Sequence, residues 1–131
     1  MKLLLDTCAF LWYILGGDEL PAQVRDLIQD RDNEVFLSPV SMWECLVKFD
    51  MGKLVLPDRP ERYLRDQRIA HGLAEMPLSD QAVMNIMKLP RIHKDPFDRM
   101  LICQALSESA TILTPDALIQ AYPVASRWQE S

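Results

Sequence analysis

The run Lys2-Leu3-Leu4-Leu5-Asp6 near the start of the chain is a short apolar segment that stops at an acidic residue. Three consecutive leucines are typical of a strand buried on both faces, as the strands of a parallel sheet are. Residues 7–15 follow as an apolar helix closed by Gly16-Gly17. A strand that leads directly into a helix is typical of an α/β fold, and it leaves Asp6 at the carboxyl end of the strand.

The same alternation of apolar runs and helical segments continues along the chain. Further strands are expected at residues 35–37 and 111–113, with a weak last strand at 122–125, whereas 75–78 is either a strand or a loop. Helices are expected at residues 21–30, 38–50, 60–70, 79–88 and 95–107. No internal repeat or linker interrupts the pattern. The sequence therefore predicts a single α/β domain over residues 1–131.

Composition and charge restrict the class of protein. With 49% apolar residues, the chain can bury a core. Its net charge of −5 argues against broad electrostatic affinity for nucleic acid or for an anionic membrane. It does not exclude a nuclease, because an acidic metal site adds negative charge that the ion offsets.

The cysteines and the start of the chain indicate a compartment. Cys8, Cys45 and Cys103 are an odd number without metal-type spacing, and we interpret them as reduced thiols of a cytosolic protein. Residues 1–6 are too short and too soon charged for a signal peptide. No apolar stretch is long enough to span a bilayer. The sequence therefore predicts a cytoplasmic protein without a membrane partner.

Four carboxylates stand at the predicted strand ends and helix starts, namely Asp6, Glu44, Asp98 and Asp116. Because ligands of a parallel sheet bind beyond the carboxyl ends of its strands, these acids are expected to meet at one edge. Carboxylates packed that closely repel one another, and a bound hard cation relieves the repulsion. Oxygen ligands of this kind suit Mg²⁺ or Mn²⁺, with Asp6, Asp98 and Asp116 as the metal ligands.

Three of the acids differ in how easily a structural role explains them. Asp6 and Asp116 can simply cap the helix or turn that follows each of them. Asp98 shares a helical face with Leu101 and Ile102, which directs it at the interior, where an unpaired charge is costly. A metal ion is the economical partner for Asp98.

Glu44 has two interpretations that stay open. Ser41 and Glu44 match the spacing of a capping box, in which case Glu44 serves the start of a helix. If the helix begins at Ser38-Pro39 instead, Glu44 lies within it and is free to point into a polar site. Lys48 is then a simple i, i+4 partner of Glu44.

The basic residues form two groups, one on the predicted helix at 60–70 and one around Asp98. The first is interpreted as a solvated helical face, with a phosphate-contacting rim as the alternative. The second crowds the Asp98 loop and is better placed to hold a phosphate beside a metal. The first group is Arg59, Arg62, Arg65 and Arg68, and the second is Arg91, Lys94 and Arg99.

The only histidines are His71 and His93. His71 is expected in solvent, whereas His93 can approach the acids through its loop. Neither belongs to a zinc motif or to a serine or cysteine catalytic arrangement. Without a well-placed histidine, we expect the metal to do most of the acid–base work.

Four motifs together resemble the PIN-domain ribonucleases, in particular the VapC-like toxins of bacterial toxin–antitoxin pairs. They occur in the family's order and cover nearly the whole chain. The Asp-Pro-Phe-Asp-Arg stretch and the Trp-Glu element are the more specific of them. The motifs are Leu4-Leu5-Asp6-Thr7, Ser38-Pro39-Val40-Ser41-Met42-Trp43-Glu44, Asp95-Pro96-Phe97-Asp98-Arg99-Met100-Leu101-Ile102 and Leu113-Thr114-Pro115-Asp116.

This resemblance implies a PIN-like three-layer fold, with a central parallel sheet of four or five strands flanked by helices. It also implies a magnesium-dependent endoribonuclease, usually dimeric, that an antitoxin silences. The implied catalytic residues are Asp6, Glu44, Asp98 and Asp116, supported by Thr7, Ser41, Asp95 and Thr114. Candidate contacts to RNA are Lys48, Arg91, Lys94 and Arg99.

In this interpretation Asp6 and Asp98 are the leading metal ligands, and Glu44 is either a ligand or the residue that orients the attacking water. Asp116 either acts through a metal-bound water or completes a second metal site. Two other functions stay open. A phosphoacceptor signalling domain also gathers acids around magnesium, but it needs paired acids after the first strand and a late lysine. A non-catalytic binding module would keep the acids for a partner's arginine.

The segment at residues 10–15 is apolar nearly all round, more than one buried helix face requires. Such a surface predicts a homodimer, and an antitoxin whose apolar helix packs on the segment while a basic side chain reaches the acids. The alternative is that Trp12 and Tyr13 belong to the core, covered by the helix at 21–30.

Overall fold

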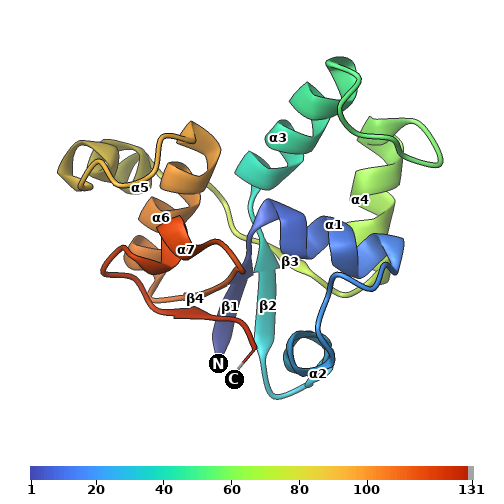
Figure 1. Ribbon diagram of the computed structural model, residues 1–131, viewed down its shortest axis with the longest axis horizontal. Helices are drawn as coiled ribbons and strands as arrows, with labels where there is room; N and C mark the ends of the chain where they lie inside the picture. The colour runs from blue at the N-terminus through green and yellow to red at the C-terminus, as the bar shows by residue number, and fades with distance from the viewer. Residues whose placement is uncertain (130–131) are drawn as a thin grey trace.

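The computed structural model describes residues 1–129, and residues 130–131 of the predicted domain lie outside the described residues. Within residues 1–129 the chain forms a parallel sheet of five strands in the order β3-β2-β1-β4-β5 (Figure 1). The predicted central parallel sheet is therefore confirmed. The strands are β1 (Lys2–Leu5), β2 (Glu34–Leu37), β3 (Ala74–Glu75), β4 (Thr111–Leu113) and β5 (Ser126–Arg127).

The helices that bring residues to the site begin at predicted caps. The side chains of Asp6, Ser38 and Asp95 each accept a backbone N–H from the first turn of the following helix. The helices are α1 (Thr7–Leu15), α2 (Ala22–Gln29), α3 (Pro39–Asp50), α4 (Pro60–Ala70), α5 (Asp80–Met84), the 3₁₀ helix η1 (Asn85–Lys88), α6 (Pro96–Glu108) and α7 (Ala117–Gln120). The segment expected as one helix at 79–88 is therefore α5 followed directly by η1.

The expected last strand at residues 122–125 is wrong, because the strand is β5 at Ser126–Arg127. The short helix α7, which the sequence analysis did not predict, uses the preceding residues. The Tyr122 N–H bonds to the Ile119 carbonyl and the Val124 N–H to the Tyr122 carbonyl, which bends this segment into turns. Pairing with β4 begins only afterwards, and the ambiguous segment at 75–78 contributes the end of β3.

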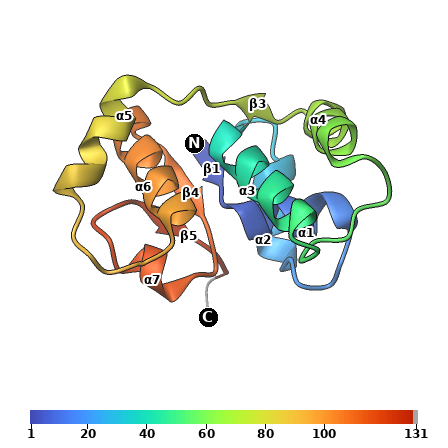
Figure 2. The same ribbon diagram turned by 90° about the horizontal axis from the view of Figure 1, so that it is seen from above.

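Strands buried on both faces separate two apolar cores. In β1, Leu3 and Leu5 point into a core built with α1, α2 and α4, whereas Leu4 points into the core formed with α6 and α7. Figure 2 shows these two groups of helices on opposite sides of the sheet. This alternation is the period-2 geometry of a strand, and it produces the three layers expected from the sequence.

The carboxyl ends of the central strands gather at one edge. In Figure 1, β1 and β2 point toward the side where α1 and α3 begin, away from the two chain termini. The Asp6 N–H donates to the Leu113 carbonyl at 3.2 Å, so the ends of β1 and β4 are held together. None of the helices within residues 1–129 is long and apolar enough to cross a membrane.

Candidate metal centre

Asp6 lies at the end of β1 and is only 3% exposed. Its Oδ1 caps α1 by accepting the Ala9 N–H at 2.8 Å, so the expected capping role is present. Burial raises the pKa of the Asp6 carboxyl, and the charge of Asp116 adds to the rise, against hydrogen bonds from Thr114 and Ala9. The helix cap therefore uses only Oδ1, one of the two carboxylate oxygens of Asp6.

Glu44 is buried within α3, and the open question about the start of this helix is resolved. Ser38 caps α3 by accepting the Val40 N–H at 3.0 Å, so Glu44 lies inside the helix. Its Oε1 accepts the Thr7 hydroxyl at 2.6 Å, and its Oε2 contacts Lys48 Nζ at 2.5 Å. Both oxygens of Glu44 are engaged, which favours an orienting and charge-balancing role over direct metal ligation.

Lys48 and Ser41 both support Glu44. Burial alone would lower the pKa of Lys48, but its bond to Glu44 and the nearby charges of Asp95 and Asp98 raise it. Lys48 is therefore turned toward the acids as their counter-charge. The Ser41 hydroxyl oxygen is buried 3.0 Å from the Thr7 hydroxyl and joins the same network.

The pKa of Asp98 is raised close to neutrality. It lies in the first turn of α6, which Asp95 caps through the Phe97 and Asp98 N–H groups. Burial raises the pKa of Asp98 to about 7, and the charges of Asp95 and Glu44 add to the rise. Within residues 1–129, only His93 approaches the Asp98 carboxylate with a cationic or N–H group, at 3.1 Å from Oδ2.

The pKa of Asp116 is shifted in the opposite direction. It caps α7 by accepting the Leu118 N–H at 2.8 Å, and its Oδ2 lies 2.9 Å from His93 Nε2. Partial burial works to raise the pKa of Asp116, but the bonds from His93 and Leu118 outweigh it and lower the pKa. Thr114 Oγ1 accepts the Asp116 N–H at 3.0 Å and so orders this loop.

His93 joins Asp98 to Asp116, and the expectation that no histidine is well placed is wrong. The Asp95 N–H donates to His93 Nδ1 at 3.1 Å, so that nitrogen carries no proton and Nε2 is the donor toward the acids. One ligand atom from each of His93, Asp98 and Asp116 lies within 4.8 Å of the others. In this tautomer His93 holds the two carboxylates rather than a cation.

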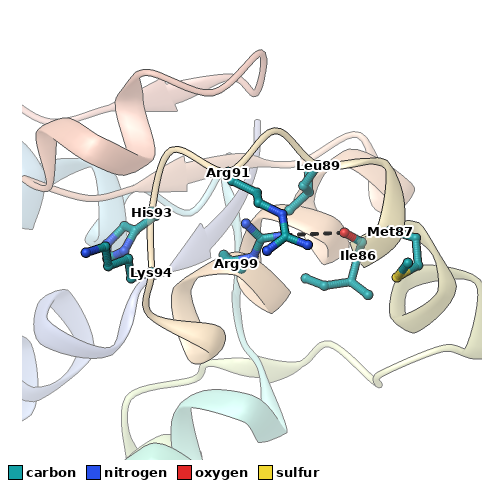
Figure 3. A pocket seen from close by; sticks show the side chains of 7 residues that line it. All are labelled: Ile86, Met87, Leu89, Arg91, His93, Lys94 and Arg99. Atoms are coloured by element: carbon teal, nitrogen blue, oxygen red, sulfur yellow. Dashed lines mark hydrogen bonds between the residues drawn. The ribbon is translucent and has the colours of Figure 1, made fainter.

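The structure brings together the acids predicted from distant segments. Mutual electrostatic effects link Asp6 with Asp116, and Asp98 with both Asp6 and Glu44. The basic residues behave differently. Arg99 turns away toward main-chain carbonyls, and with Arg91 and Lys94 it lines a pocket that His93 also lines (Figure 3).

Histidine 93 is the site residue that pattern reasoning undervalued. Its position five residues before Asp98 did not show which way its ring points. Contacts from separate segments place this residue, since the Tyr122 hydroxyl accepts the backbone N–H of His93 at 2.8 Å and Asp116 contacts the ring Nε2 at 2.9 Å. No local sequence signal encodes these contacts.

The donor set fits a hard divalent cation. Asp6 is buried and Asp98 is partly buried, so the ionised forms of both are disfavoured, and a cation would relieve both the cost of burial and the mutual repulsion. Oxygen-rich sites of this kind suit Mg²⁺ or Mn²⁺ better than Zn²⁺. Asp6, Asp98 and Asp116 are the residues that would hold it.

Comparison with known proteins agrees with this geometry. A family model described as the PIN domain matches residues 3–124. No curated protein matched the chain. The solved structures that resemble this chain have low sequence identity to it, so the likeness shows a shared fold.

Three of these structures contain VapBC proteins. A chain of VapBC2 from Rickettsia felis, bound to a promoter DNA fragment, matches with a TM-score of 0.73 at 16% identity, over 98% of this chain and 100% of that chain. A chain of DNA-bound VapBC from Salmonella typhimurium matches with a TM-score of 0.70 at 17% sequence identity, over 97% of each chain. A chain of VapBC-5 from Mycobacterium tuberculosis matches with a TM-score of 0.53 at 21% sequence identity, over 92% of this chain and 89% of that chain.

Proposed function

The chain belongs to the PIN-domain family, and from this premise we propose that it is a magnesium-dependent endoribonuclease and the toxin of a toxin–antitoxin pair. The observation that carries the proposal is the Asp98 carboxylate, which is partly buried beside other acids and has its pKa raised to about 7. A group perturbed in this way, in a cluster of oxygen ligands, is typical of a catalytic cation site.

The residues of the chain have distinct roles in this proposal. Asp6, Asp98 and Asp116 hold the cation, which supplies activation of a water molecule and charge compensation at the scissile phosphate. Glu44 is fixed by Thr7 and Lys48 and orients the attacking water. His93 Nε2 carries a proton beside the acids and holds the Asp98 and Asp116 carboxylates in place, and the leaving oxygen takes its proton from water.

We expect the purified protein to cleave RNA internally with Mg²⁺ or Mn²⁺ and to lose this activity when the ion is chelated. The reason is that the acids repel a phosphate unless a cation lies between them. Gel analysis of end-labelled RNA, with and without chelator, measures the effect. Equal cleavage in the presence of chelator, or no cleavage of total cellular RNA by a folded sample, would contradict the proposal.

An antitoxin partner is supported by several of the similar structures, which contain VapBC, one of them described as a member of the VapBC family of toxin–antitoxin systems. We propose that a cognate antitoxin covers the acidic cluster and places a basic side chain against Asp98. Both toxin and antitoxin then act in the cytoplasm, where the RNA substrate lies.

We place the candidate surface for apolar contacts on α3 rather than on α1. In the segment at residues 10–15, Phe10 and Tyr13 are buried in the core. Leu11, Trp12 and Ile14 are partly buried against it, and Trp12 packs on Trp128 with ring centroids 6.1 Å apart. The outward side of α3 instead carries an exposed apolar row, here named the α3 row: Trp43, which is 61% exposed, Leu46 and Phe49. Exposed apolar rows of this kind mark interfaces.

We expect the protein to form a homodimer through the α3 row, and Leu46→Glu to dissociate it, because a buried unpaired charge is costly. The matched control is Leu118→Glu, which changes a similarly exposed leucine on α7. Sedimentation at micromolar concentration measures the mass. A wild-type monomer near 15.1 kDa, or dissociation by both variants alike, argues against this interface.

A further inference from the structure

A pocket of about 520 Å³ lies beside the acidic cluster, lined from η1, the following loop and α6 (Figure 3). His93 lines this pocket and also contacts Asp98 and Asp116. The pocket and the acidic cluster therefore share a wall. A phosphodiester held at the acids has its neighbouring nucleotide within reach of the pocket.

The pocket carries positive charge that acids do not compensate. Arg91 and Lys94 line it, and neither forms an ion pair within residues 1–129. Arg99 also lines the pocket, and among the described residues its guanidinium bonds only to carbonyls, so its charge is not paired with an acid either. In a chain of net charge −5, these cations make a local site for an anion.

The wall of the pocket is fixed before any ligand binds. The Arg99 guanidinium donates to the carbonyls of Ile86 and Pro90 at 3.4 and 3.3 Å, which ties the loop to α6. The hydroxyl of the buried Tyr122 accepts the His93 N–H at 2.8 Å and holds the other end of the loop. A loop held at both ends loses less entropy on binding.

The opposite end of the pocket is apolar. Ile86, Met87 and Leu89 line it, and Met87 is 86% exposed. Figure 3 shows the two arginines between this apolar end and the end that carries His93. The cations therefore lie nearer the acidic cluster, and the apolar surface lies farther out.

We propose that this pocket binds one unstacked nucleotide next to the scissile phosphodiester, with its phosphate on Arg91 and Lys94 and its base against Met87. The inference rests on the proposed function, because it takes RNA as the ligand. The volume is in the range of small-molecule sites. Bases in a duplex are stacked inside the helix, so only an unpaired nucleotide can present its face to Met87.

The charge contacts are tested by the salt dependence of RNA binding. A fluorescently labelled, single-stranded RNA of mixed sequence is titrated by anisotropy in the presence of chelator, so that no cleavage occurs. We expect Arg91→Ala/Lys94→Ala to reduce the slope of log K against log salt by about 0.7, since both side chains contact one phosphate and each phosphate neutralised in single strands contributes about 0.7. The matched control is Arg62→Ala/Arg65→Ala, which removes the same charge from α4.

The base contact is tested with the same probe. Met87→Ala should weaken single-strand binding about fivefold by removing apolar contact, and it should leave the salt slope unchanged. Met84→Ala, which removes another exposed methionine that does not line the pocket, is the control. The complementary duplex of the same sequence should show no Met87 effect.

Equal slopes for wild type and Arg91→Ala/Lys94→Ala, or the same reduction in the α4 control, would overturn the proposal. If the pocket instead serves an acidic protein segment, the salt slope of RNA binding will not change in the pocket variant, and this result also overturns the proposal. If wild type cleaves RNA while the pocket variants bind it normally, the pocket inference fails and the proposed function stands. If the slope depends on the pocket but no divalent ion supports cleavage, the proposed function fails and the pocket stands.

Discussion

Asp98→Asn is expected to abolish metal-dependent RNA cleavage, lowering the rate by about a thousandfold, while it stabilises the metal-free protein. Asparagine has nearly the same volume but no negative charge, so one cation ligand is lost and the repulsion from Asp95 and Glu44 disappears. At about pH 8 the free energy of unfolding should rise by about 2 kcal/mol, which is part of the cost of ionising a carboxyl whose pKa is near 7. Single-turnover cleavage and urea unfolding in chelator measure the two effects.

The matched control is Asp80→Asn, which changes an exposed aspartate in the first turn of α5, as Asp98 lies in the first turn of α6. This variant should cleave RNA normally and lose only a few tenths of a kcal/mol from the helix dipole. Asp6→Asn should behave as Asp98→Asn does, because the amide oxygen can still cap the Ala9 N–H. Retained cleavage by Asp98→Asn at saturating magnesium would falsify the site assignment.

Magnesium affinity is expected to rise about tenfold per pH unit up to about pH 7 and then to level off, because the cation needs ionised Asp98. The metal-free protein should show the opposite trend. The folded pKa of Asp98 is about 7, whereas an unfolded aspartate has a pKa of about 3.9. Between these values the folded state binds more protons than the unfolded state, so stability falls as pH rises through this window.

The other two aspartates modify this profile in known directions. Asp6 also has a raised pKa, so it adds to the loss of stability with rising pH. Asp116 has a lowered pKa and therefore contributes stability that is lost only at more acidic pH.

Thermal unfolding across pH, in chelator and in increasing magnesium, measures both trends. Asp98→Asn is the internal control, since it should flatten the pH dependence of magnesium binding and raise metal-free stability most above pH 7. The role of Asp98 would be contradicted if the melting temperature of the metal-free protein rose from about pH 5 to about pH 8, or if magnesium affinity did not depend on pH.

Much of the architecture followed from local patterns. The run of leucines before Asp6 required a strand buried on both faces, and Ser38 and Asp95 marked the starts of α3 and α6. The short α7 and the displaced β5 were not predictable, because four helical residues and two paired residues carry no periodic signal.

The sequence by itself determined the sheet, the caps and the acids that follow the strands, because each depends on neighbouring residues and on a parallel sheet gathering its strand ends at one edge. Only the tertiary structure decided how each acid is used. Thr7 and Lys48 bind the two carboxylate oxygens of Glu44, partial burial raises the pKa of Asp98, and Asp95 determines which ring nitrogen of His93 carries the proton. These outcomes depend on distances between segments far apart in the chain, and burial and charge effects act through space rather than along the sequence.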